Sequence, residues 1–202
     1  CGSGALLALL LMRTLTAAGA APAGYEYCTL CHGATGGGNV AILAPALAGI
    51  EPWYLAEQLQ GYRMRHRGKD FATDPAGTEM RVVTNDLRPE ETDAIGAWLS
   101  RLPVVMPPVT VAGDARRGKS LYATHCAACH GARAEGNAAL HAPSLVRLND
   151  WYVVASFHKY QAGLRGADAT DPWANAMQVQ SRALPTDFAI EDIARFLGTL
   201  KP

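Results

Sequence analysis

Four of the five cysteines form two pairs of identical spacing, and each pair runs directly into a histidine. The two motifs are Cys28-Thr29-Leu30-Cys31-His32 and Cys126-Ala127-Ala128-Cys129-His130. Residues three and four apart are neighbours on a helical turn, so two thiols at this spacing can form thioethers with the vinyl groups of one haem while the adjacent imidazole reaches the iron. This is the attachment pattern of c-type haem. The sequence therefore predicts two covalently bound haem c groups, each with one iron.

Three other uses of these cysteines explain less. A thioredoxin-like redox pair needs a βαβ context and gives no role to the following histidine. A zinc site would gather four thiolates across the 94 residues that separate the pairs, again without the histidines. A disulfide inside either short loop would be strained and would hold little together.

The sequence around the motifs repeats at an offset of 98 residues. Residues 28–70 and 126–168 share 17 identical positions out of 43, whereas average composition gives about two or three by chance. The shared positions include Pro45/Pro143, Trp53-Tyr54/Trp151-Tyr152, Tyr62/Tyr160 and Arg67-Gly68/Arg165-Gly166. The chain is therefore one haem-binding unit written twice.

One histidine leaves the opposite axial position of each iron open, and a methionine thioether is the usual electron-transfer solution. Met80 lies 48 residues after His32, and Met177 lies 47 residues after His130. We therefore predict these two methionines as the second axial ligands. The other methionines and histidines do not repeat; they are Met12, Met64, Met106, His66, His125, His141 and His158. We expect these four histidines to be surface or locally hydrogen-bonded residues.

Other repeated side chains suit the rest of a haem. Arg67 and Arg165 are predicted to pair with the propionates, because a guanidinium offers a fork that matches a carboxylate; a solvated arginine is the alternative. The repeated aromatic pairs are interpreted mainly as packing around the haem, with a polar tip available for a propionate. They are Trp53, Tyr54, Trp151 and Tyr152.

Composition indicates a globular protein and excludes some function classes. Of 202 residues, 49% are hydrophobic and 18% charged, which is enough to bury real cores. The 18 basic and 18 acidic residues cancel, and no basic tract occurs, which argues against nucleic-acid binding. We find no nucleophile–base pair, phosphate-binding loop or second metal cluster, so we predict no catalytic residue.

Hydrophobic periodicity predicts helices in both units. After Pro89, four apolar residues fall on one helical face, and a second set does so after Pro185. These are Ile95, Trp98, Leu99 and Leu102, and Ile193, Phe196, Leu197 and Leu200. Segments 53–62, 151–160 and 114–124 are also expected to be helical, whereas Pro22 and glycines make the first helix of the first unit short or irregular. Alternating strands are absent, so we expect an all-α fold around the haems.

The prolines of residues 103–109 favour an extended linker between the units. We therefore divide the chain into an apolar N-terminal segment (1–23), a first haem domain (24–103), a linker (104–113) and a second haem domain (114–202).

Over residues 24–202, these motifs resemble the class I c-type cytochromes, and specifically the two-domain, di-haem cytochrome c4 group. The resemblance is carried by Cys-x-x-Cys-His-Gly, a later Pro-x-Leu, and a methionine before a C-terminal helix. It implies two tandem cytochrome c domains, each wrapped around its haem. It also implies that Pro45 and Pro143 accept a hydrogen bond from the ligand histidine through their carbonyls.

The same resemblance implies electron transfer, one electron per haem. We expect the donor to be a membrane quinol-oxidising complex, such as a quinol:cytochrome c reductase, or a dehydrogenase, and the acceptor to be a terminal haem–copper oxidase. A fixed cytochrome subunit of a larger respiratory or dehydrogenase complex is an alternative. A di-haem peroxidase is another, although it needs an iron site that can open.

The N-terminal segment begins Cys1-Gly2-Ser3, as a bacterial lipoprotein does after its signal is removed. We therefore expect a lipid on Cys1, which would hold the protein on the periplasmic side of the cytoplasmic membrane. The apolar run 5–12 ends at Arg13 and is too short to cross a bilayer. A tilted or paired membrane helix and an unmodified thiol are the alternatives.

Overall fold

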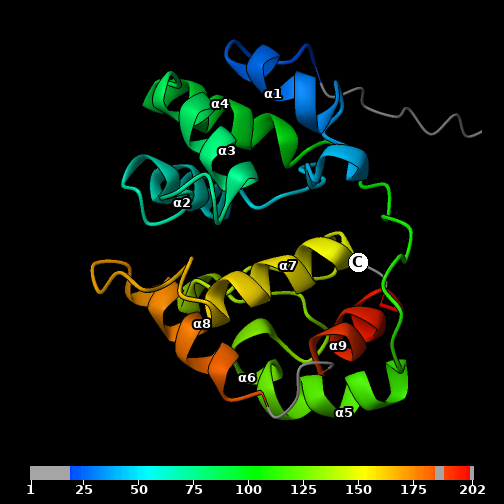
Figure 1. The fold of residues 1–202 in the computed structure, drawn as a ribbon. Helices are drawn as coiled ribbons and strands as arrows, with labels where there is room; N and C mark the ends of the chain where they lie inside the picture. The colour runs from blue at the N-terminus through cyan, green and yellow to red at the C-terminus, as the bar shows by residue number, and fades with distance from the viewer. Residues whose placement is uncertain (1–18, 185–188, 201–202) are drawn as a thin grey trace, which may run out of the picture.

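A computed structural model describes residues 19–184 and 189–200 as two helical units joined by an extended segment (Figure 1). The only β-structure in these residues is one isolated bridge in each unit, Asn39 with Ala44 and Asn137 with Ala142. The predicted all-α fold is thus confirmed. Cys1, the apolar run 5–12 and Pro185 lie outside the described residues, so the expectations attached to them stay predictions.

The first unit is built from short helices. They are α1 (Tyr25–His32), the 3-10 helix η1 (Val40–Ile42), α2 (Pro52–Arg63), α3 (Pro75–Asn85) and α4 (Pro89–Leu99). Helices α2, α3 and α4 each begin with proline, which suits the first helical position because the amide there has no intrahelical partner. No helix precedes α1 in the described residues, so the motif of the first unit lies in its first helix.

The second unit repeats this plan with one addition. Its helices are α5 (Ala115–His125), α6 (Ala127–His130), the 3-10 helix η2 (Ala138–Leu140), α7 (Asp150–Gln161), α8 (Pro172–Arg182) and α9 (Ala189–Leu197). Helix α5 is the one predicted from residues 114–124, and the side chain of Asp114 caps it by accepting hydrogen bonds from the amides of Arg116 and Arg117. It packs against α9.

Each unit has its own hydrophobic core, which the predicted amphipathic helices supply. Ile95 and Leu99 of α4 are fully buried in the first core, and Ile193 and Leu197 of α9 occupy the matching places in the second. Two helices were not predicted. Neither α3 nor α8 buries a large apolar side chain, and so neither shows an apolar stripe in the sequence.

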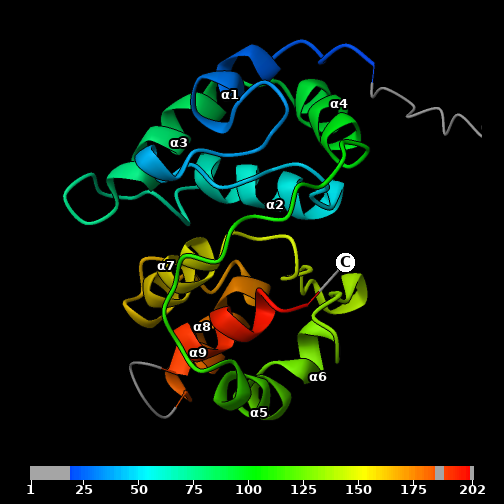
Figure 2. The same ribbon diagram turned by 90° about the vertical axis from the view of Figure 1, so that its right-hand side faces the viewer.

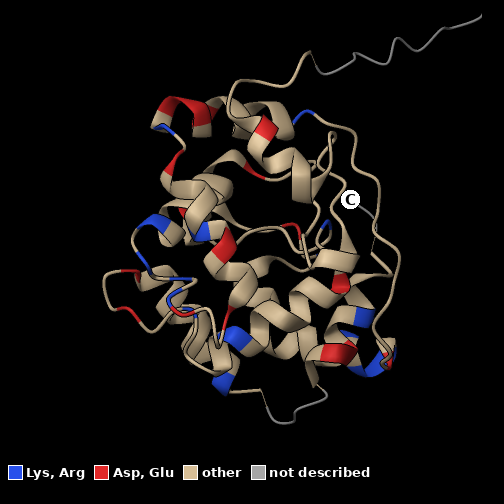
Figure 3. Cartoon of the chain, turned by 45° about the horizontal axis from the view of Figure 1, so that its top comes forward, with Lys and Arg blue, Asp and Glu red and all other residues tan. Residues whose placement is uncertain are grey.

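The units face each other through α2 and α7, and the linker runs along one side of both (Figures 1 and 2). Hydrogen bonds cross the boundary: the Ala46 amide donates to Asn149 Oδ1 at 2.8 Å, and Arg147 Nη1 donates to the Gly49 carbonyl at 2.7 Å. Acidic and basic residues are interspersed over both units (Figure 3). Specific polar contacts therefore join the two units.

The crossing of α5 and α9 yields a stability prediction. A Cβ added at Gly118 would lie 1.9 Å from the Asp192 carbonyl oxygen. Gly118→Ala should therefore destabilise the second unit by about 1–3 kcal/mol, the usual cost of overpacking. Thermal unfolding of the holoprotein, followed by circular dichroism, measures this. Gly37→Ala is the control, because nothing lies within 4 Å of the added Cβ, and equal melting curves for the two variants would contradict the packing argument.

Candidate haem sites

The two motif histidines end α1 and α6, and both are buried. His32 Nδ1 lies 2.7 Å from the carbonyl oxygen of Pro45, and His130 Nδ1 lies 2.9 Å from that of Pro143. A ring nitrogen that donates its hydrogen to a carbonyl leaves Nε2 as the free ligand atom and fixes the ring plane. Both units thus present an oriented imidazole, through the carbonyl contact that the resemblance implied.

Two buried tyrosines hold the motif helices in place. Tyr25 donates to the Gly33 carbonyl at 2.8 Å, and Tyr122 donates to the Gly131 carbonyl at 2.7 Å. The sequence comparison missed this pair because Tyr25 precedes the first cysteine by three residues and Tyr122 by four. The helix is continuous through the motif in α1, whereas α5 and α6 are separated at Cys126. An alignment allowing this one-residue shift finds both tyrosines.

Burial favours the uncharged forms of the motif histidines and of the first cysteine of each motif. It lowers the pKa of His32 and of His130, which favours the neutral imidazole that binds metals. Burial also raises the pKa of the Cys28 and Cys126 thiols to about 11, with Glu26 adding to the first shift and Cys129 to the second. A dithiol redox enzyme needs a lowered thiol pKa, so this environment opposes the thioredoxin-like reading.

The predicted methionines lie on equivalent helices. Met80 of α3 packs against the first core together with Cys28, and Met177 of α8 packs against the second core together with Cys126. Each methionine therefore shares a core with the first cysteine of its own motif. Their sulfurs stay predicted ligands.

A cavity of about 870 Å³ lies at the boundary and is lined by residues of both units. It is lined by His130, Met177, Cys126, Cys129, Pro143 and Leu145 from the second haem motif and its surroundings. It reaches across the domain boundary to Tyr54 and Arg67. This volume is in the upper range of cavities that hold cofactors. Its size and lining fit a haem attached to Cys126 and Cys129.

Arg67 and Arg165 are buried at the boundary, with exposed fractions of 6% and 3%. Both donate to the same acceptor, Gln58 Oε1, at 2.7 and 2.8 Å. Each guanidinium also lies over a tyrosine ring of its own unit, Tyr62 at 4.4 Å and Tyr160 at 4.3 Å. The Nε atom of each arginine has no hydrogen-bond partner, and neither arginine pairs with a carboxylate of the described residues.

The two buried arginine charges favour anions close to them. Burial opposes ionisation of the Tyr152 phenol, but the charges of Arg67 and Arg165 outweigh it and lower the pKa of this phenol to about 7. Buried charges without partners are costly. No carboxylate of the described residues pairs with these two guanidinium groups, whereas haem propionates would. The two buried Nε atoms without partners therefore fit a haem whose propionates lie at this boundary.

The remaining predicted residues lie around the same boundary. Tyr54 and Tyr152 line the cavity, and the indole nitrogen of Trp151 is buried without a partner. Trp53 stands edge-on to His141, with ring centroids 5.8 Å apart. His141 also contacts Glu57 of the first unit and stacks on Trp173 of its own.

Two histidines therefore differ from the expectation of surface or local contacts. His141 reaches Glu57 in the other unit, and His66 reaches Asp168 and Asp171 in the other unit. His158 does bond locally, to Gln161. Neither domain-crossing contact repeats, so the repeat comparison could not find them.

All-α units that each present a Cys-x-x-Cys-His helix, an oriented imidazole and a methionine-bearing helix define a c-type cytochrome. The cytochrome c family model matches this chain twice, over residues 17–103 and 115–201. The chain belongs to the cytochrome c family, as a class I protein of two tandem domains that carries two covalently bound haem c groups on Cys28/Cys31 and Cys126/Cys129.

Relatives with assigned functions are electron-transfer proteins. The chain is 29% identical over 200 residues to a thiosulfate dehydrogenase electron acceptor of Stutzerimonas stutzeri (strain A1501), covering 93% of this chain and 85% of the relative. It is 28% identical over 182 residues to cytochrome c4 of Thiocapsa roseopersicina, covering 86% of each. Electron transfer by two haems is thus the activity of this chain.

Two solved structures share the fold. Cytochrome c4 of Acidithiobacillus ferrooxidans superposes with a TM-score of 0.71 at 23% identity, covering 87% of this chain and 99% of that one. A thiosulfate dehydrogenase from Marichromatium purpuratum superposes with a TM-score of 0.67 at 26% identity, covering 86% of this chain and 36% of that one. Within the described part of the present chain, no helix is long and apolar enough to span a membrane.

The site geometry predicts the haem content. The purified protein should hold two haems per chain, neither of them extracted by acid–acetone, because thioether bonds survive this treatment. A pyridine haemochrome assay against protein concentration measures the ratio. Replacing both Cys126 and Cys129 with alanine should leave one covalent haem. Haem released from the unaltered protein, or a ratio of one haem per chain, would contradict the prediction that both motifs bind haem covalently.

Proposed function

We propose that the protein accepts electrons from a periplasmic dehydrogenase and passes them to a terminal acceptor such as a haem–copper oxidase. The observation that carries this proposal is the match along 93% of the chain to a thiosulfate dehydrogenase electron acceptor. Haem iron supplies the chemistry, by alternating between ferrous and ferric forms. The protein's residues bind, orient and shield it.

Each residue's role in this proposal follows from its contacts. His32 and His130 would hold the iron through Nε2, because Nδ1 is committed to the carbonyl of Pro45 or Pro143. Met80 and Met177 would supply the second ligand of each iron. Arg67 and Arg165 would pair with propionates through their free Nε edges.

The alternatives differ in attachment or in chemistry. A fixed subunit is supported by the dehydrogenase structure in which the same fold fills only 36% of a longer chain. A peroxidase is opposed by a methionine-bearing helix in both units, since peroxide needs an iron position that opens.

Methionine ligation gives a spectroscopic prediction. Met80→Ala and Met177→Ala should each abolish the long-wavelength thioether–iron band of one ferric haem, and replacement by histidine should lower that haem's potential, because axial ligands tune potentials over roughly 0.8 V. Absorption spectroscopy and spectroelectrochemical titration measure the two effects. Met64→Ala is the control, since this methionine is exposed. If Met80→Ala resembles Met64→Ala, Met80 is not a ligand.

The donor class gives a kinetic prediction. Thiosulfate plus a catalytic amount of a thiosulfate dehydrogenase should reduce the oxidised holoprotein by two electrons per chain under anaerobic stopped-flow conditions. Thiosulfate alone should reduce it slowly. Reduction only by a quinol-oxidising complex would move the donor to that class, and rapid steady-state turnover of hydrogen peroxide would favour the peroxidase.

A further inference from the structure

The helices that bear the methionines start at the boundary between the units. Asp74 caps α3 by accepting from the Gly77 amide at 3.0 Å, and Asp171 caps α8 by accepting from the Ala174 amide at 3.0 Å. Each cap lies six residues before its methionine, Met80 or Met177. Because neither helix buries a large apolar side chain, polar contacts at these caps are important in fixing its position.

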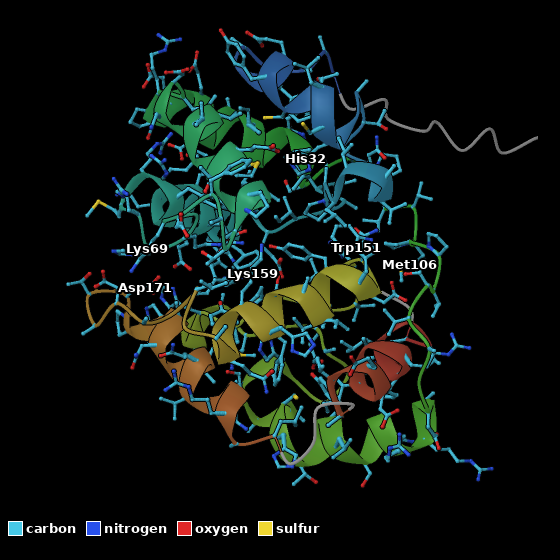
Figure 4. The ribbon with its side chains drawn as sticks, in the orientation of Figure 1. His32, Lys69, Met106, Trp151, Lys159 and Asp171 are labelled. Carbon is cyan, nitrogen blue, oxygen red and sulfur yellow. The ribbon has the colours of Figure 1, made fainter. Side chains whose placement is uncertain are left out.

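A lysine of the second unit holds the cap of the first. Lys159 Nζ of α7 donates to Asp74 Oδ1 at 2.7 Å, and the Asp74 side chain is only 4% exposed. Figure 4 shows Lys159 on the side of α7 that faces the first unit. The Lys159 carbonyl in turn accepts from the amides of Leu164 and Arg165. This lysine therefore joins the turn before the buried arginine to the start of α3.

The reciprocal contact is looser. His66 of the first unit lies 3.7 Å from the Asp171 carboxylate and 3.7 Å from that of Asp168, both beyond hydrogen-bond distance. At the repeat offset, Lys159 matches Gly61 and His66 matches Leu164. Different positions thus reach equivalent caps, and of these two caps only that of α3 has a carboxylate that is both buried and directly paired with a cation.

We propose that Lys159 is a positioning residue for Met80: by holding Asp74 across the boundary, it fixes the first turn of α3 and keeps the thioether on the first iron. The inference rests on the proposed ligation by Met80 and not on the identity of any electron donor. Without Lys159, the Asp74 carboxylate would be buried without a counter-charge, which strongly favours rearrangement or hydration of the helix start. The second haem depends on no such lysine.

Competition by imidazole tests this, because imidazole is a good iron ligand that can replace a thioether. In the ferric holoprotein, the hyperfine-shifted ε-methyl proton signals of the two methionines report each haem separately, assigned with Met80→Ala and Met177→Ala. Lys159→Met should tighten imidazole binding at the first haem by about tenfold or more and leave the second unchanged. Lys119→Met is the matched control, an exposed lysine of the same unit.

Further variants separate positioning from general loosening. Asp74→Asn keeps an oxygen for the Gly77 amide but removes the charge, so it should also tighten imidazole binding at the first haem. Lys159→Arg keeps the positive charge, so its imidazole affinity should equal that of the unaltered protein. Equal shifts at both haems would show only a loosened boundary and would overturn the proposal. So would an affinity within about twofold of the Lys119→Met control, or the absence of a Met80 signal in the unaltered protein. Reduction by a donor enzyme is unaffected by these outcomes, so the proposed function is tested apart.

Discussion

Two buried guanidinium groups that share one glutamine oxygen are the constraint on which the domain boundary depends. Arg67 and Arg165 come from different units and repel each other, yet both are drawn to Gln58 Oε1. Their charge is large enough to lower the pKa of the neighbouring Tyr152 phenol to about 7 against the effect of burial. Burying two such charges without counter-charges is costly, and haem propionates are the predicted anions at this boundary. With propionates at these guanidinium groups, the two haems would contribute to the electrostatics of docking as well as fill each core.

The repeat is strict where haem is attached and relaxed where the units meet. The imidazole–proline contact recurs at 2.7 and 2.9 Å, because each iron needs the same oriented ligand. At the boundary, Gln58 matches Ser156, and only the glutamine bridges both arginines. An environment without two-fold symmetry surrounds the two haems with different polar groups, which is the physical condition for different reduction potentials. A chain with two unequal sites can give electrons a preferred direction.

Sequence reasoning reached the features that depend on local spacing. The helical motif, the amphipathic helix α4 and the capped helix α5 each follow from residues within a few turns of one another. It missed α3 and α8, since their buried side chains are small or polar, such as Thr84 and Ser181, and leave no apolar period. An aspartate followed by proline does mark both starts, at 74–75 and 171–172. Contacts such as Lys159 with Asp74 join residues 85 apart and have no signal in one sequence.

These elements hold the motif histidines and the predicted methionine ligands in different ways. Three features fix each motif histidine: the covalent attachment of the adjacent cysteines, the hydrogen bond to a proline carbonyl, and the hydrogen bond of a buried tyrosine such as Tyr25. The methionine side rests on a helix with little apolar anchorage of its own, whose start is set by a capping aspartate. Where stability is unevenly distributed, change concentrates in the weaker element. The capping aspartates lie at the domain boundary, and so do the residues that follow the two prolines, since the Ala46 amide donates to Asn149 Oδ1 and the Ser144 amide donates to Glu51 Oε1. Docking of the units therefore involves the prolines that orient the histidines as well as the helices that carry the predicted methionine ligands.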